Sequence, residues 1–75
     1  MIIYFLEDGD YMLLDYLVKN YEKGEPIFLA DISIEGMSEE NIRYHLKKLT
    51  DAGVICRFEA GIYYLPKKIF LVRIL

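Results

Sequence analysis

The segment from Ser38 to Leu65 constrains the fold most strongly, because a helix pattern in it runs directly into two β-prone runs. Ser38 suits an N-cap, since its hydroxyl can accept a hydrogen bond from a free amide of the first helical turn. Gly53 can adopt the left-handed conformation that commonly ends a helix. The sequence therefore predicts a helix over residues 38–52 and a β-hairpin after it.

The predicted helix has an apolar side and a polar side. Ile42, Leu46 and Leu49 recur at helical spacing, and His45 falls beside them, which indicates a boundary or core position for the histidine. The solvent side carries Asn41, Arg43, Tyr44, Lys47 and Lys48. These side chains fit a DNA major groove, because arginine and asparagine can bond base edges in pairs and lysine can contact phosphates. A solvated helix face is the plainer alternative.

The hairpin is predicted from two short runs, residues 54–58 and 62–65, that are rich in β-branched and aromatic side chains. The residues between them, Glu59-Ala60-Gly61, form a short turn. Cys56 lies in the first run, where we expect it to pack as a small hydrophobic side chain.

The N-terminal half contains a second helix pattern, from about residue 10 to residue 23, with an apolar stripe. Asp8 or Asp10 can cap its start, and Gly24 and Pro26 end it. With Glu7, these aspartates form an acidic cluster that is typical of a solvated helix start.

The connection between the two long helices is less regular. Residues 26–28 fit a short extended piece. Residues 29–34 fit a short helix or a strand, and the tight glycine turn at residues 35–37 favours the helix. A short helix, a glycine turn and a capped second helix together form a helix-turn-helix.

Composition limits the chain to one small domain, with a core over about residues 10–65 and apolar terminal segments at residues 1–6 and 67–75. The last segment fits a helix as well as a strand. A single cysteine excludes an internal disulfide and indicates a reducing, cytoplasmic location. No apolar run approaches the length of a membrane span, and the start lacks signal-peptide features. The absence of glutamine, with abundant isoleucine, tyrosine, lysine and glutamate, is a hint of life at high temperature.

Charge is distributed unevenly along the chain. The net charge is −3, but residues 1–40 hold ten acidic and two basic side chains, whereas residues 41–75 hold two acidic and seven basic ones. Positive charge is thus concentrated in residues 41–75, which include most of the predicted helix-hairpin unit, and a nucleic-acid-binding face requires such a local asymmetry.

Residues 37–55, Met-Ser-Glu-Glu-Asn-Ile-Arg-Tyr-His-Leu-Lys-Lys-Leu-Thr-Asp-Ala-Gly-Val-Ile, followed by a turn and Gly-Ile-Tyr-Tyr-Leu at 61–65, resemble winged helix-turn-helix transcription regulators. The resemblance covers about residues 26–65. It implies an α+β fold with three helices and a C-terminal β-hairpin wing. It also implies a sequence-specific double-stranded DNA-binding regulator whose recognition helix, residues 38–52, lies in the major groove.

The resemblance also implies roles for individual residues. Candidates for base contacts are Glu40, Asn41, Arg43, Tyr44 and Lys47. Ser38, Lys47 and Lys48 would lie near phosphates, and Arg57 at the base of the wing would reach the backbone or the minor groove. Glu59 departs from the family pattern, because many wings carry basic residues at the tip. Helix capping is the simpler explanation for Glu39 and Glu40.

A homodimer through the terminal segments is expected, since two-fold regulators match two-fold half-sites. Two other functions remain open. One is a winged-helix protein-protein interaction module without DNA binding, which the acidic total charge favours. The other is binding of single strands or RNA through Tyr44, Tyr63 and Tyr64, which needs exposed rings.

Catalytic chemistry is not predicted. His45 is the only histidine, and no second histidine or cysteine stands at metal-ligand spacing. The sequence has no phosphate-binding glycine loop and no nucleophile elbow. We therefore expect no enzyme, no metal, no cofactor and no small-molecule substrate.

Overall fold

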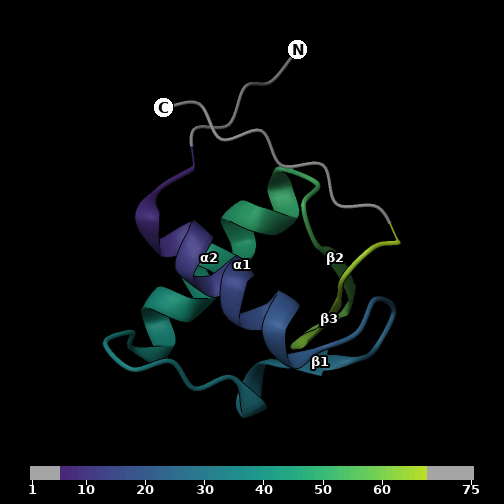
Figure 1. Cartoon of the computed structure of the whole chain (residues 1–75), viewed down its shortest axis with the longest axis horizontal. Coiled ribbons are helices and arrows are strands. Elements are labelled where there is room, and N and C mark those ends of the chain that lie inside the picture. Colours follow the sequence, from purple (N-terminus) through teal and green to yellow (C-terminus); the bar gives the residue numbers. More distant parts are fainter. Residues whose placement is uncertain (1–5, 68–75) are drawn as a thin grey trace.

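A computed structural model describes residues 6–67 of the chain (Figure 1). The fold class is α+β, as predicted, with two α-helices and one three-stranded antiparallel sheet in these residues. The helices are α1 (Asp8–Asn20) and α2 (Glu39–Asp51), and the strands are β1 (Ile27–Phe28), β2 (Cys56–Glu59) and β3 (Ile62–Tyr64). In Figure 1 the helices pack across each other and the sheet lies to their right.

Helix α1 begins two residues earlier and ends three residues earlier than the sequence pattern predicted. Its N-cap is Glu7, whose backbone N–H donates to the Asp10 carboxylate at 2.7 Å. Asp10 therefore acts from the third helical position instead of the cap position. At the other end Tyr21 is already extended, so the helix stops before Gly24.

The short helix expected over residues 29–34 is a single 3-10 turn, Leu29–Asp31. Its first residue is still tied to the sheet, because the Leu29 N–H donates to the Gly61 carbonyl at 2.9 Å. Phe28, at the cap position, supplies no side-chain acceptor, and Ile32 is extended. The local signals for continuing a helix are therefore missing on both sides.

Helix α2 forms where it was predicted. The Ser38 hydroxyl accepts from the Asn41 N–H at 3.1 Å, and Gly53 has φ +77°. Val54 and Ile55 were expected to begin a strand, but both are buried, and the Val54 N–H closes the helix end on the Leu49 carbonyl at 3.0 Å. The first strand of the hairpin consequently begins only at Cys56.

The strand order is β1-β3-β2, so the extended piece before the 3-10 turn pairs with the second strand of the hairpin. Ile27 lies opposite Tyr63, and Phe28 lies opposite Ile62. Between β2 and β3 the register shifts, which leaves Phe58 as the extra residue of a β-bulge.

The core lies where the two helices and the sheet meet. Its fully buried side chains come from α1, α2, β1 and the segments around the hairpin: Leu13, Leu17, Ile27, Leu46, Leu49, Ile55 and Leu65. Within residues 6–67, neither helix has the length and apolar composition needed to cross a membrane. The apolar terminal segments predicted to mediate a homodimer lie almost wholly outside the described residues.

Candidate nucleic-acid interface

The outward side of α2 is the candidate interface. Asn41, Arg43, Tyr44 and Lys47 are exposed, as the helical spacing predicted, whereas Ile42, Leu46 and Leu49 are buried. Glu40, which directly precedes Asn41, is exposed as well. The Ser38 hydroxyl, a predicted phosphate contact, already accepts the Asn41 backbone N–H, so its clearest role is to cap the helix.

Two cations on this side are paired along the helix itself. The Arg43 guanidinium lies 2.8 Å from the Glu39 carboxylate, and the Lys47 ammonium lies 2.9 Å from the Asp51 carboxylate. All four side chains are at least 46% exposed. Because water screens exposed pairs, each contributes at most about 1 kcal/mol, and a phosphate could replace the carboxylate at little cost.

Lys48 does not belong to the outward side, and this corrects the prediction. Its side chain is 21% exposed, and its ammonium lies 2.8 Å from one Asp10 oxygen and 3.5 Å from a Glu7 oxygen. The hydrogen bond to Asp10 raises the pKa of Lys48, partly opposed by burial and reinforced by the charges of Asp10 and Glu7. Lys48 is thus directed at α1, and its role as a phosphate contact loses its geometric basis.

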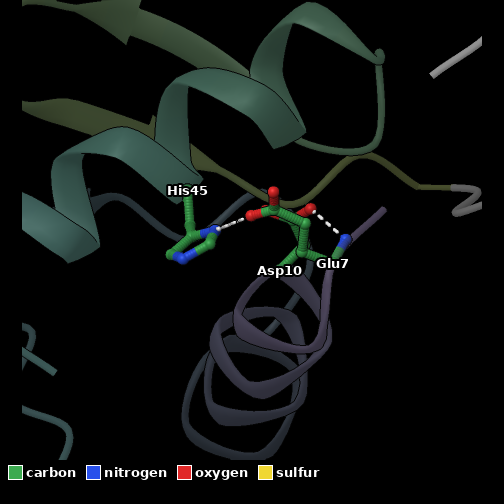
Figure 2. A group of neighbouring side chains, drawn as sticks. All are labelled: Glu7, Asp10 and His45. Atoms are coloured by element: carbon green, nitrogen blue, oxygen red, sulfur yellow. Dashed lines mark hydrogen bonds and ion pairs between the residues drawn. The ribbon is translucent and has the colours of Figure 1, made fainter. Parts of the chain in front are cut away.

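Asp10 is the buried centre of a polar cluster that joins α1 to α2. Its side chain is fully buried, which contradicts the expected solvated helix start. One oxygen lies 2.6 Å from His45 Nδ1, and the other accepts from the Glu7 N–H (Figure 2). The second oxygen also accepts from the Lys48 ammonium. Burial raises the pKa of the Asp10 carboxyl, but the partners Lys48, Glu7 and His45 together hold it below its ordinary value of 3.8.

The cluster requires the two helices to approach closely, and Gly9 permits this. A Cβ atom at Gly9 would lie 2.3 Å from His45 Nε2 and 2.6 Å from Cε1. Only a residue without a side chain therefore leaves room for the imidazole ring against α1. His45 is buried, as predicted, but through a polar contact that its apolar neighbours in the sequence did not indicate.

Donor atoms of Glu7, Asp10 and His45 lie within 4.8 Å of one another, a spacing that could also hold a metal ion. The ammonium of Lys48 is in direct contact with both carboxylates. A metal ion would have to displace this cation. The arrangement supports a structural role for the cluster, in which one buried carboxylate holds two side chains of α2.

The cluster also reaches the outward side through Tyr44. The Tyr44 ring is 51% exposed, but it meets the His45 ring edge-on at a centroid distance of 4.9 Å. The Lys48 ammonium lies 5.7 Å from the Tyr44 ring centroid. His45 and Lys48, the two residues of α2 that contact Asp10, thus also contact the exposed Tyr44 ring and support its orientation.

A groove of about 390 Å³ separates the first half of α2 from the hairpin. Its walls are Phe28, Leu29, Ala30, Glu39, Arg43, Ala60, Gly61 and Ile62. Arg43 and the hairpin turn thus border the same depression. Arg57 is exposed on β2, as is Glu59 at the turn.

Comparison of the chain with protein-family models, curated proteins and solved structures gives no significant match.

Proposed function

We propose that this chain is a sequence-specific double-stranded DNA-binding regulator of transcription, a winged helix-turn-helix in which α2 enters the major groove. The supporting observation is the exposed row Arg43, Tyr44 and Lys47 on a helix whose opposite side is anchored to α1. A helix that is anchored on one side and exposes arginine and lysine on the other suits base edges and phosphates.

The arrangement after α2 supports the assignment of the hairpin as the wing. Gly53 turns the chain out of the helix, and the hairpin turn borders the groove that Arg43 also lines. Winged helix-turn-helix proteins have a further helix where this chain has the 3-10 turn Leu29–Asp31, so the helix-turn-helix is shorter here. The tight turn closed by the Met37 N–H on the Ile34 carbonyl, at 3.1 Å, still leads into the capped start of α2.

Each exposed residue has a distinct role in this proposal. Asn41, Arg43 and Tyr44 contact base edges, and Glu40 can accept from a cytosine amino group. Lys47 contacts phosphate, and Arg57 reaches the backbone or the minor groove beside the hairpin. Lys48 positions α2 through Asp10 instead of contacting the duplex.

In vitro selection of duplexes from a random pool, followed by titration at two salt concentrations, tests the proposal. Arg43→Ala should weaken binding to the selected site by about 1–3 kcal/mol and relax its specificity. Lys47→Ala should weaken binding to all sequences similarly and reduce the salt dependence by about one phosphate contact.

Lys19→Ala is the matched control, because Lys19 pairs with Asp15 at 2.8 Å in the same i,i+4 geometry on α1. It should leave DNA affinity unchanged. If Arg43→Ala and Lys47→Ala bind the selected duplex as tightly as the parent chain, α2 is not the recognition helix.

The second candidate function is a protein-protein interaction module. The acidic hairpin turn at Glu59, the net charge of −3 and the exposed ring of Phe58 support it. This candidate predicts no duplex binding at any salt concentration, so the same titration separates the two functions.

A further inference from the structure

Two phenylalanine rings on the sheet are exposed to solvent. Phe58 is 72% exposed and Phe28 is 47% exposed. Both line one groove of about 340 Å³, whose other walls are Gly24, Pro26, Ile62, Tyr63 and Tyr64. Single exposed apolar residues need no explanation, but rings gathered around one depression mark a binding surface. We refer to this depression as the aromatic groove.

The aromatic groove is built into the strands and does not need a binding partner to form. Phe28 is fixed opposite Ile62 by the β1–β3 pairing. Phe58 is the extra residue of the bulge in β2, and its side chain is 72% exposed. The backbone positions of both residues are set by the sheet, so no chain segment has to fold when a planar ligand stacks on the rings.

The aromatic groove continues the groove that Arg43 lines. Phe28 and Ile62 belong to the walls of both depressions. A nucleic-acid strand that contacts Arg43 can therefore pass along the hairpin turn and reach the exposed rings without leaving the surface.

Charge favours one end of this path for phosphates. Arg43 stands at the α2 end, and the exposed Arg57 is on the same strand as Phe58. The acids near the path are Glu39, which lines the same groove as Arg43 and pairs with it at 2.8 Å, Glu59 at the end of β2, and Glu25 between the wall residues Gly24 and Pro26. Phosphates are thus favoured near the arginines, while the apolar far end suits an uncharged base.

We propose that the aromatic groove binds unpaired bases of a nucleic-acid strand that extends from the duplex held by α2. This inference rests on the proposed function, because the path to the rings begins at the DNA-facing side of α2. Bases stack on exposed aromatic rings largely independently of their identity, since every base has a π-face. The chain would then prefer a duplex that adjoins a single-stranded segment over a blunt one.

Fluorescence anisotropy with four probes tests this preference. The probes are a blunt mixed-sequence duplex, the same duplex with a thymidine overhang at one 3′ end or one 5′ end, and the thymidine strand alone. One overhang should raise the affinity about tenfold, a typical effect of stacking one base on an aromatic ring. Phe58→Ala should remove that gain and leave the affinity for the blunt duplex unchanged.

Met12→Ala is the control variant, because the exposed fraction of Met12, 48%, is similar to the 47% of Phe28, but Met12 lies on α1 and outside both groove linings. It should keep the full gain from the overhang. A thermal melt of each variant shows whether the fold is retained, which we expect because both side chains are largely in solvent.

The outcomes separate this inference from the proposed function. Arg43→Ala should weaken binding of blunt and overhang duplexes alike, whereas Phe58→Ala should affect the overhang alone. If the blunt duplex does not bind but the thymidine strand does, and only with Phe58 present, the groove binds unpaired bases, but the duplex proposal and the junction between duplex and single strand that rests on it are both overturned. The inference is overturned if neither overhang adds affinity or if Phe58→Ala keeps the gain. Loss of self-association in Phe58→Ala, without any overhang effect, would assign the groove to a second copy and overturn it too.

Discussion

The two sides of α2 hold cation–carboxylate pairs of nearly equal length in very different surroundings. On the inner side the Lys48 ammonium lies 2.8 Å from Asp10, whose side chain is fully buried. On the outer side the Arg43 guanidinium lies 2.8 Å from Glu39, and these side chains are 61% and 71% exposed. The distance alone therefore does not rank the pairs.

Burial decides what each pair can do. Removing one member of a buried pair leaves an uncompensated charge and costs several kcal/mol, whereas an exposed pair contributes about 0–1 kcal/mol. The inner pair can fix α2 against α1. The outer pairs are weak enough to open, so that Arg43 can exchange the Glu39 carboxylate for a ligand. A binding helix needs both properties, on opposite sides.

Removing the inner carboxylate should have the largest effect. Asp10→Ala leaves Lys48 and His45 without their shared partner and uncaps the Glu7 N–H, so we expect a loss of about 3 kcal/mol in unfolding free energy. Urea denaturation at neutral pH measures it. Asp15→Ala is the matched control, because Asp15 pairs with Lys19 at 2.8 Å in solvent. Its cost should stay within about 0.5 kcal/mol, and equal losses in the two variants would refute the comparison.

Adding a methyl group at the helix contact should have the next largest effect. Gly9→Ala drives a Cβ into the buried His45 ring, and overpacking of this kind costs about 1–3 kcal/mol. In a His45→Ala background the ring is gone, so the same substitution should cost little. This double-mutant cycle, measured by urea denaturation, isolates the contact. An unchanged cost in the second background would show that the ring is not the obstacle.

Local signals in the sequence predicted most of the outer side of α2. The Ser38 cap, the left-handed Gly53 and the helical spacing of Ile42, Leu46 and Leu49 all act within a few residues. The hairpin also followed from local β-prone runs and a short turn. Such signals do not depend on the rest of the fold, so they can be recognised from the sequence alone.

The inner cluster could not be predicted in the same way, because its partners are distant in the sequence. Asp10 and His45 are 35 residues apart, and no local rule joins them. One signal was available: Asp10 precedes Leu13, Leu14 and Leu17 at helical spacing, which places a carboxylate on the buried stripe of α1. A buried carboxylate requires a partner. Lys48 borders the inward face of α2 and proved to be that partner.

Acid should weaken the contact that Asp10 makes between α1 and α2. The pKa of Asp10 is lower in the folded chain than its ordinary value of 3.8, so the carboxylate contributes stability above that value and loses it as the pH falls through the folded-state pKa. The stability difference between the parent chain and Asp10→Asn should therefore shrink on acidification below about pH 4. Lys48→Met should shift this loss to higher pH. The variant lacks the ammonium that lowers the pKa of Asp10, whereas burial of the carboxyl still raises that pKa. Unfolding followed by circular dichroism across the acid range measures both effects.

Opening an outer pair should have the smallest effect on folding and still alter binding. Glu39→Gln removes the carboxylate that holds Arg43, and the change in unfolding free energy should stay within about 0.5 kcal/mol. If the proposed duplex binding is correct, affinity should rise several-fold, because the guanidinium is released and a negative charge leaves the phosphate-facing side. Asp15→Asn opens the corresponding pair on α1 and should leave affinity unchanged. Equal gains in both variants would mean that net charge alone sets affinity, so that opening the pair on α2 has no special role.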